Sequence, residues 1–301
     1  MASGAKRQVG RTVTDIDELL EKFESMELQN DLMLSGFNVG IEIETGDLYE
    51  EVVNLKSKVF KTVQDSSVTG YSENNYNELG PGTEYVLKKI YMKYFIPKKH
   101  EKIKKRMNEI LIHSHSSVNL KKDEEMREEM SADYEVDLFD EDLLDRTENL
   151  EKEDEDTGGL HVHLSHDMIT KEKFPNFARV FQDLWVSRFF KKLQAKYELR
   201  TNNRFCRINT DYEADKHEKY RQLNIKNSFN EGETLWHFEF RGMGDIIGDM
   251  KKGAAYVDAY IRDLARLFVI AYHYMMANSE NPSQRKRLRR RAKELSLKLR
   301  F

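Results

Sequence analysis

Cysteine is almost absent from this chain of 301 residues, and Cys206 alone cannot form an intrachain disulfide. A secreted scaffold held together by disulfides is therefore excluded, and a reducing cytoplasm is the expected location. Long apolar runs are missing as well. No stretch approaches the roughly 18 uninterrupted apolar residues of a membrane helix, and residues 1–12 lack the apolar core of a secretory signal. We therefore expect a cytoplasmic protein without a membrane span.

A large net charge is also missing, since the formal charge is only −4 although charged residues make up 34% of the chain. This balance argues against a dedicated nucleic-acid-binding protein. The charges are instead segregated. Residues 123–156 contain 18 Asp or Glu against three Lys or Arg, and residues 285–301 contain nine Lys or Arg against one Glu. We expect the basic segment to make weak contacts with nucleic acid or with an acidic protein surface.

Charge and apolar spacing together divide the chain into three parts. Residues 14–29 begin with a capping threonine and early acids and then place apolar residues at helical spacing, so we expect a helical extension over residues 1–36. One domain is expected over residues 37–278. It is interrupted at 121–157 by an acidic insertion with too few apolar residues for a core of its own. Residues 279–301 form the basic tail.

Three stretches, at 39–44, 158–165 and 235–241, alternate apolar residues with polar ones. This pattern is typical of strands that bury one face. The polar faces carry Glu42 and Glu44, then His161, His163 and Ser165, then His237, Glu239 and Arg241. Each of these strands therefore presents a face that can do chemistry.

The remaining pattern predicts two more strands and three helical regions. Residues 65–68 and 82–86 form short strands joined by a polar loop, with Glu84 presented from the second. The helical regions are 86–112, 175–199 and 252–277. The first is broken at Pro97, which predicts two helical pieces. Because one-sided alternation is what an antiparallel sheet with one open face requires, we expect an α+β fold: a mainly antiparallel sheet with helices packed on one face.

The polar faces describe a site for divalent cations and a polyanion. Two carboxylates on one strand face repel each other unless a cation lies between them, and arginine supplies a planar fork suited to phosphate or carboxylate. Magnesium with a nucleoside triphosphate is a common ligand of this kind. The chain has no Gly-x-x-x-x-Gly-Lys-Ser/Thr loop, no Gly-x-Gly-x-x-Gly turn and no His-Glu-x-x-His helix, so a P-loop, a Rossmann site and a zinc protease do not explain it. Solvated strand faces are the alternative interpretation.

Four motifs, taken in order, resemble a known family. They are Gly40-Ile41-Glu42-Ile43-Glu44, Asp65-Ser66-Ser67-Val68 with Gly82-Thr83-Glu84, Gly159-Leu160-His161-Val162-His163, and Glu239-Phe240-Arg241. Over residues 37–275, outside the insertion, the chain resembles the amidoligases of the carboxylate–amine ligase superfamily, which also contains glutamine synthetase and glutamate–cysteine ligase. The resemblance implies a curved, mainly antiparallel sheet of the glutamine-synthetase catalytic-domain type. It also implies ATP-dependent phosphorylation of a carboxylate to an acyl phosphate, which an amine then attacks to form an amide.

The resemblance further implies roles for individual residues. Two or three magnesium ions would be held against ATP by Glu42, Glu44, Glu84, His161 and Glu239. The expected catalytic residues are His163 near the phosphates, and Arg221 and Arg241, which would offset charge on the phosphoryl group or the substrate carboxylate. Arg204 and Asn224 are expected to contact the nucleotide, together with His163 and Arg221. No second carboxylate beside Glu84 matches the extra metal ligand of glutamine synthetase.

The implied partners are a carboxylate donor and an amine acceptor, which can be a small molecule, a peptide or a protein. A function of a different class fits the same sequence. The chain could be a non-catalytic binding or structural protein that retains the fold and acts through its acidic insertion and basic tail. Magnesium-dependent binding of ATP favours the ligase over this alternative.

Overall fold

The computed structural model describes residue 20 and residues 36–52, 57–71, 79–89, 93–114, 159–200, 206–225, 236–244 and 253–277. Nearly all of the extension at 1–36, the whole acidic insertion at 121–157 and the basic tail at 279–301 lie outside these residues. The described residues therefore belong almost entirely to the domain expected at 37–278.

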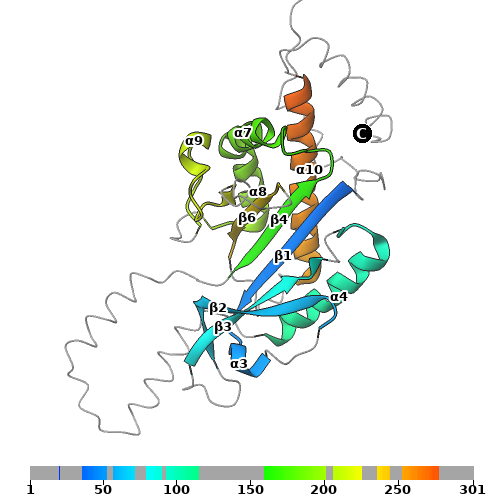
Figure 1. The fold of residues 1–301 in the computed structure, drawn as a ribbon, viewed down its shortest axis with the longest axis vertical. Helices are drawn as coiled ribbons and strands as arrows, with labels where there is room; N and C mark the ends of the chain where they lie inside the picture. The colour runs from blue at the N-terminus through cyan, green and yellow to red at the C-terminus, as the bar shows by residue number, and fades with distance from the viewer. Residues whose placement is uncertain are drawn as a thin grey trace, which may run out of the picture.

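Six strands form one open sheet in the order β2-β3-β1-β4-β6-β5 (Figure 1). Their bounds are β1 (Phe37–Thr45), β2 (Phe60–Tyr71), β3 (Leu79–Leu87), β4 (Leu160–His166), β5 (Leu223–Asn224) and β6 (Phe238–Met243). Every neighbouring pair is antiparallel, so the predicted α+β class and antiparallel sheet are confirmed. The pair β1 and β4 lies at the centre and joins an N-terminal half, β2-β3-β1, to a C-terminal half, β4-β6-β5.

The α-helices of the described residues are, in chain order, α3 (Tyr49–Val52), α4 (Pro97–His113), α7 (Phe174–Leu184), α8 (Phe190–Tyr197), α9 (Tyr212–Asp215) and α10 (Ala254–Ala277). Helix α10 packs against α4, α7 and β4, whereas the short α3 contacts β2 and β3. Within the described part of the chain, no helix is both long enough and apolar enough to cross a membrane.

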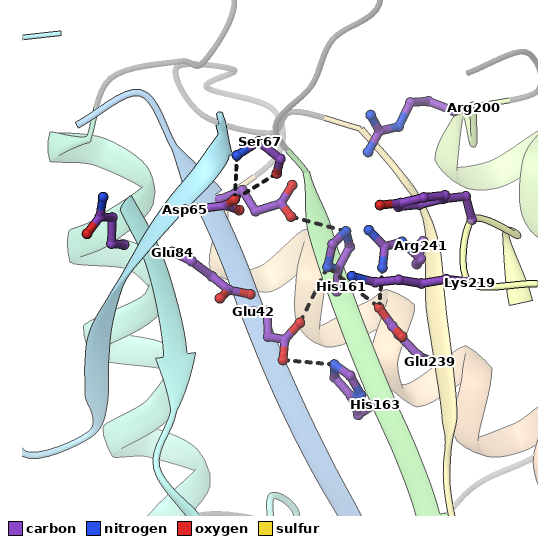
Figure 2. A pocket seen from close by; sticks show the side chains of 13 residues that line it. Glu42, Asp65, Ser67, Glu84, His161, His163, Arg200, Lys219, Glu239 and Arg241 are labelled. Carbon is purple, nitrogen blue, oxygen red and sulfur yellow. Dashed lines mark hydrogen bonds and ion pairs between the residues drawn. The ribbon is translucent and has the colours of Figure 1, made fainter. Parts of the chain in front are cut away.

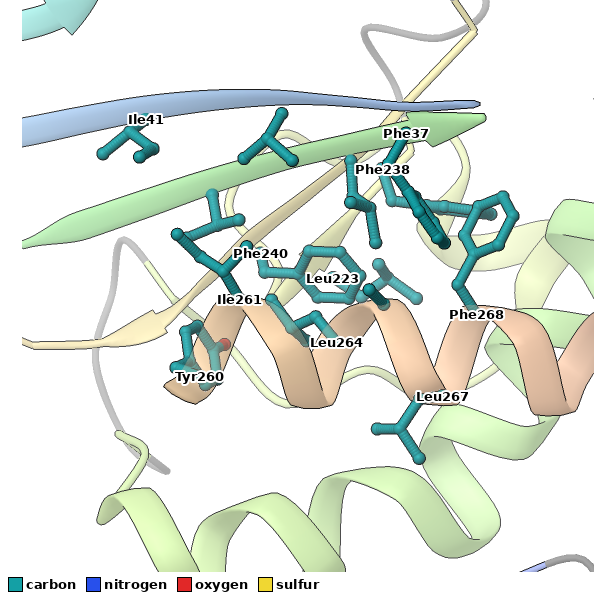
Figure 3. Close-up of a cluster of buried hydrophobic side chains, with 14 of the residues drawn as sticks. Phe37, Ile41, Leu223, Phe238, Phe240, Tyr260, Ile261, Leu264, Leu267 and Phe268 are labelled. Carbon is teal, nitrogen blue, oxygen red and sulfur yellow. The ribbon is translucent and has the colours of Figure 1, made fainter. Parts of the chain in front are cut away.

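The core lies between α10 and the sheet. Figure 3 shows Ile261 and Leu264 of α10 close to Phe240 of β6, below the strand that carries Ile41, and all four side chains are fully buried. Burial of each such side chain contributes about 1.5–3 kcal/mol. Because side chains alternate along a strand, burying Ile41 turns its neighbour Glu42 to the opposite face of the sheet.

The first helical piece predicted before Pro97 is wrong at both of its ends, and residues 90–92 lie outside the described residues. Strand β3 continues to Leu87, which pairs with Phe60 of β2, and residues 94–96 form a turn. Leu87 is buried in the core, so the apolar spacing here belongs to an extended strand. The second piece is confirmed as α4. Pro97 stands in its first turn, where a missing N–H leaves no hydrogen bond unmade.

The strand predicted at 65–68 belongs to a longer one, because β2 begins at Phe60 and ends at Tyr71. Its pairing with β3 is irregular between Asp65 and Thr69. Extra residues on one strand of a pair form a bulge, which bends the strand and changes the direction of its side chains. Asp65 is the last residue in register before the bulge, two residues after Val63, which lies opposite Glu84, so alternation places it on the face of Glu84.

The helix predicted at 175–199 is confirmed as α7 and α8, with a π turn between them at Trp185–Phe189. A π turn accommodates one extra residue in the helix. Both ends of the turn face the core, since Trp185 is 1% exposed and Phe189 is 0% exposed. The helix predicted at 252–277 is confirmed as α10.

Candidate active site

A cavity of about 410 Å³ lies on the face of the sheet that α10 does not cover (Figure 2). Its lining is almost wholly polar and consists of Glu42, Glu44, Gln64, Asp65, Ser67, Glu84, His161, His163, Arg200, Lys219, Tyr220, Glu239 and Arg241. Side chains from all three polar strand faces line it, together with Glu84. The cavity is therefore built where residues far apart in the sequence meet across the sheet.

The pairing register brings these side chains together. The directly opposed pairs are Glu42 with His161, Glu44 with Glu84, and His163 with Glu239. Directly opposed residues in an antiparallel pair lie about 4.5–5.5 Å apart and point to the same face. Strands β3, β1, β4 and β6 thus each add an acid or an imidazole to one continuous polar surface.

His161 lies at the centre of the carboxylates. Its Nδ1 is 3.4 Å from Oε2 of Glu42 and 3.8 Å from Oε1 of Glu239. Its Nε2 is 3.6 Å from Oε1 of Glu44. The residue is only 4% exposed, so three carboxylates from two strands converge on a single buried ring.

His163 points at the same carboxylate from the other side. Its Nε2 lies 3.1 Å from Oε1 of Glu42. The residue opposite His163 on β1 is Gly40, and a Cβ atom at Gly40 would come within 3.0 Å of the His163 Cβ. Glycine at this position therefore leaves the room that the imidazole occupies.

The carboxylates that line the cavity lie close together and raise one another's pKa values. Burial raises the pKa of Glu84 to about 8, and so do its interaction with Glu42 and the charges of Glu44 and Asp65. Burial also raises the pKa of Glu44, and the charge of Asp65 adds to this, although His161 partly offsets it. Without a cation, these carboxylates retain protons to higher pH than isolated glutamates do.

The carboxylates and the neighbouring His163 shift each other's pKa values. Burial alone would raise the pKa of Glu42, but the charge of His163 and hydrogen bonds from both strand histidines outweigh burial and lower it. Burial alone would lower the pKa of His163, yet Glu42, Glu239 and Glu84 raise it to about 9. The carboxylates around His163 therefore favour its protonated form.

Two groups of side chains have the geometry to hold a metal ion, with ligand atoms within 4.8 Å of one another. They are Glu42, Glu84 and His161, and Glu42, His163 and Glu239. Glu42 belongs to both groups, so it would be a ligand whichever group holds an ion. Carboxylate oxygens suit magnesium or manganese, and a bound cation would relieve the repulsion that raises the pKa of Glu84.

The opposite wall of the cavity is basic. Arg241 donates from Nη1 to Oε1 of Glu239 over 2.8 Å, and Asn224 donates its amide to the other oxygen of Glu239. Glu239 is thus fixed from both sides and is 2% exposed. Arg200 donates from Nη2 to the carbonyl of Met243 over 3.1 Å and also lines the cavity.

Two of the expected site residues do not line the cavity. Arg221 directs Nε to Oδ1 of Asp215 at 3.0 Å and donates from Nη1 to the Ile208 carbonyl. Asp215 is completely buried, and a buried carboxylate needs a paired charge, so the position of Arg221 does not support a catalytic role. Asn224 is 1% exposed and supports Glu239 instead of facing the cavity. Arg204, the other expected nucleotide contact, lies outside the described residues.

Sequence reasoning missed Asp65 as a site residue, along with Arg200, Lys219 and Tyr220. Asp65 accepts hydrogen bonds from the backbone N–H and the hydroxyl of Ser67 at 2.9 and 2.7 Å, and this fixes its carboxylate at the cavity. The Asp-x-Ser pattern was the available signal, since such residues form local turns. The charge of Asp65 helps to raise the pKa of Glu84, but among the described residues Asp65 belongs to neither group with metal-binding geometry.

Comparison with known proteins yields no relative: no protein-family model matches the chain, and no curated protein sequence matches it.

Proposed function

We propose that this cavity is the active site of an ATP- and magnesium-dependent carboxylate–amine ligase with a fold of the glutamine-synthetase catalytic-domain type. One observation carries the proposal. Carboxylates and imidazoles from four adjacent strands converge on one buried region, opposite a wall that contains Arg200, Lys219 and Arg241. A cation-binding wall facing an anion-binding wall is the arrangement that phosphoryl transfer from a metal-bound triphosphate needs.

The donor set fits magnesium. Glu42, Glu84 and Glu239 offer hard oxygen ligands in two groups that share Glu42, and Glu44 and Asp65 stand at the edge of the same region. When bound, magnesium would offset charge on the phosphate oxygens of ATP and orient the terminal phosphate. The repulsion among these acids in the metal-free protein would then be relieved.

The residues of this chain would act by orientation and charge. Arg241, fixed on Glu239 at 2.8 Å, would direct its remaining N–H groups toward the phosphoryl group in transfer. His163, whose Nε2 lies 3.1 Å from Oε1 of Glu42, would lie near the phosphates and hold that carboxylate in position.

The reaction has two steps. A carboxylate oxygen of the acid attacks the terminal phosphorus of ATP, the bond from that phosphorus to ADP breaks, and an acyl phosphate forms. The amine nitrogen then attacks the acyl carbon, the bond from that carbon to the phosphate oxygen breaks, and the nitrogen loses a proton to solvent. The products are an amide, ADP and phosphate.

A trapping assay tests the proposal. The full chain is incubated with ATP, magnesium, pooled carboxylic acids and hydroxylamine, which captures an acyl phosphate as a hydroxamate that is detected as its coloured ferric complex. We expect hydroxamate and phosphate to form only when acid, ATP and magnesium are all present. Glu42→Gln should lower the rate at least about 100-fold, since it removes a ligand common to both metal groups.

Glu213→Gln is the matched control. Glu213 is a glutamate on α9 that pairs with Arg179 at 2.6 Å and does not line the cavity, so this variant should retain the full rate. Absence of both turnover and magnesium-dependent binding of ATP would favour the non-catalytic binding protein instead. Equal rates in both variants would refute the metal assignment.

A further inference from the structure

Helix α4 carries a row of positive charges on the face that the core does not cover. Lys98, Lys102 and Lys105 follow one another at spacings of four and three residues, so they form one stripe along the helix. All three are exposed, whereas Ile103 and Met107 are fully buried. We call the three lysines the lysine stripe. The whole helix contains six Lys or Arg against two Glu, so it is strongly basic.

The acids of α4 do not neutralise the lysine stripe. Glu109 pairs with Arg106 at 2.7 Å, and Glu101 lies 3.8 Å from the ring of His100. Among the described residues, no acid forms an ion pair with a lysine of the stripe. Like charges at these spacings destabilise a helix. An anionic partner along the stripe would therefore relieve repulsion within α4.

The two ends of α4 indicate the chemistry of that partner. The first turn contains no acid, and Ile96 at the N-cap position makes no side-chain hydrogen bond to the helix. The N–H groups at the start of a helix favour negative charge nearby. At the other end, the side chain of Ile112 is 64% exposed. A partner that covers α4 should thus be acidic and should also carry apolar side chains.

One segment of this chain has that chemistry and follows α4 directly. Residues 123–156 contain 18 Asp or Glu against three Lys or Arg, and also Tyr134, Leu138 and Phe139. They begin nine residues after Ser114, the C-cap of α4. Nine residues span up to about 30 Å, and the 17 residues of α4 are about 25 Å long. The acidic segment is therefore long enough to reach the whole lysine stripe.

We propose that the lysine stripe of α4 is the docking surface for the acidic segment 123–156 of the same chain. The segment is joined to the described residues at Ser114 and Gly159. A tethered segment meets its target at an effective concentration on the order of millimolar, which favours it over a separate acidic partner.

Docking on α4 would also keep the acidic segment away from the cavity. Helix α4 packs against α10 (Figure 1), and the cavity lies on the face of the sheet that α10 does not cover. The excess negative charge of the segment would then lie across the sheet from a site proposed to bind a polyanion. The docking itself does not depend on the proposed function.

The first measurement is zero-length cross-linking of the full chain. A water-soluble carbodiimide activates a carboxylate, which then forms an amide with a lysine amine in contact with it. We expect links between the lysine stripe and acids of the segment at an ionic strength of about 0.01 M, where charges act over about 30 Å. The links should fall at least about fivefold at about 1 M, where this range is about 3 Å. A mixture of unlabelled and ¹⁵N-labelled chains separates links within one chain from links between copies.

A triple variant gives the specific test. It carries Lys98→Gln, Lys102→Gln and Lys105→Gln, and the readout is the rate at which a glutamyl endopeptidase cuts within the segment. Cleavage follows the population of the undocked form, and several exposed charge contacts are lost together. We expect cleavage at low ionic strength to be about tenfold faster than in the wild type. At high ionic strength the two rates should agree.

The matched control removes three exposed lysines elsewhere. It carries Lys171→Gln, Lys173→Gln and Lys191→Gln, which lie near the starts of α7 and α8. Its net charge equals that of the stripe variant, and its cleavage rate should be that of the wild type. Circular dichroism checks that both variants are folded, and the cross-linking of the wild type needs no variant.

Each result decides one question. Links within one chain, together with faster cleavage in the stripe variant alone, support the docking. Equal acceleration in both variants shows a general charge effect and overturns it. Links between copies, or mainly to the basic residues 285–301, overturn it as well. A stripe that an oligonucleotide protects from acetylation, without any link to the segment, would assign α4 to nucleic acid instead. Neither measurement uses ATP or magnesium, so a failure here leaves the proposed function untouched.

Discussion

Replacing Glu42 by glutamine should remove the proton from His163 at neutral pH. In the metal-free protein the pKa of His163 is about 9 against an ordinary 6.5. At 1.36 kcal/mol for each pH unit, this difference favours the charged imidazole by about 3 kcal/mol. Glu42 is the acid that contributes most to it. Without that charge, the burial that lowers the pKa of His163 is less opposed, and we expect the pKa to fall toward its ordinary 6.5.

The free energy of unfolding should also depend on the protonation of His163. A folded-state pKa above the unfolded value stabilises the protein fully below pH 6.5, and this contribution is lost as the pH rises through about 9. Glu84, with a pKa of about 8 against 4.5, acts in the same direction over a lower range. The metal-free wild type should therefore lose stability between pH 6.5 and 9. The Glu42→Gln variant should show a shallower loss, because Glu42 contributes to both raised pKa values.

The assay is ¹⁵N NMR of the metal-free protein labelled on histidine, titrated from pH 5.5 to 9.5. At pH 7.5 the ring nitrogens of His163 should report an imidazolium in the wild type and a neutral imidazole in Glu42→Gln. Glu213→Gln should titrate as the wild type does. An unchanged titration in Glu42→Gln would refute the reasoning, and so would a wild-type His163 that titrates near 6.5.

Two further predictions concern buried acids away from the cavity. Asp215→Asn should destabilise the protein by about 3 kcal/mol, because it leaves the guanidinium of Arg221 without its charge partner. Urea unfolding measures the change in stability, and a loss below about 1 kcal/mol would contradict the prediction. Burial alone would raise the pKa of Asp258, but its hydrogen bond to His100 and the charge of Arg262 lower the pKa to about 2. Asp258 therefore stabilises the fold above pH 3.8, and this contribution is lost as the pH falls toward 2. Asp258→Asn should therefore unfold with a difference from wild type of about 1–2 kcal/mol at pH 7 that shrinks below pH 4; parallel acid-unfolding curves for the two proteins would argue against the assignment.

The strands of this sheet were predictable because each buries only one face. Ile41 and Ile43 must enter the core, so Glu42 and Glu44 between and beside them must face away from it. The same argument applies to the histidines of β4 and to Glu239 on β6. A period of two identifies both the strand and the side of the strand on which its chemistry lies.

Contacts that depend on tertiary structure were not predictable in this way. Whether Arg221 enters the cavity or turns to a buried acid depends on where α9 brings Asp215, and no local pattern contains that information. Lys219 and Arg200 come from segments outside the strands, where periodicity gives no orientation. The stretch before Pro97 misled for a related reason, since its apolar spacing suits a helix, whereas pairing of Leu87 with Phe60 makes its start a strand.

The central pair of strands has a consequence for how the protein folds. Strand β1 ends at Thr45 and its partner β4 begins at Leu160, so their pairing closes a very long loop, which is slow and entropically unfavourable. Glu42 and Glu84 belong to one half of the sheet, and His161 and Glu239 to the other. A divalent cation bound by residues of both halves would cross-link β1 and β3 to β4 and β6. By mass action it would add about 2.7 kcal/mol to the folded state at a free concentration 100 times its Kd, so the cations proposed for the reaction would also help to keep the two halves of the sheet together.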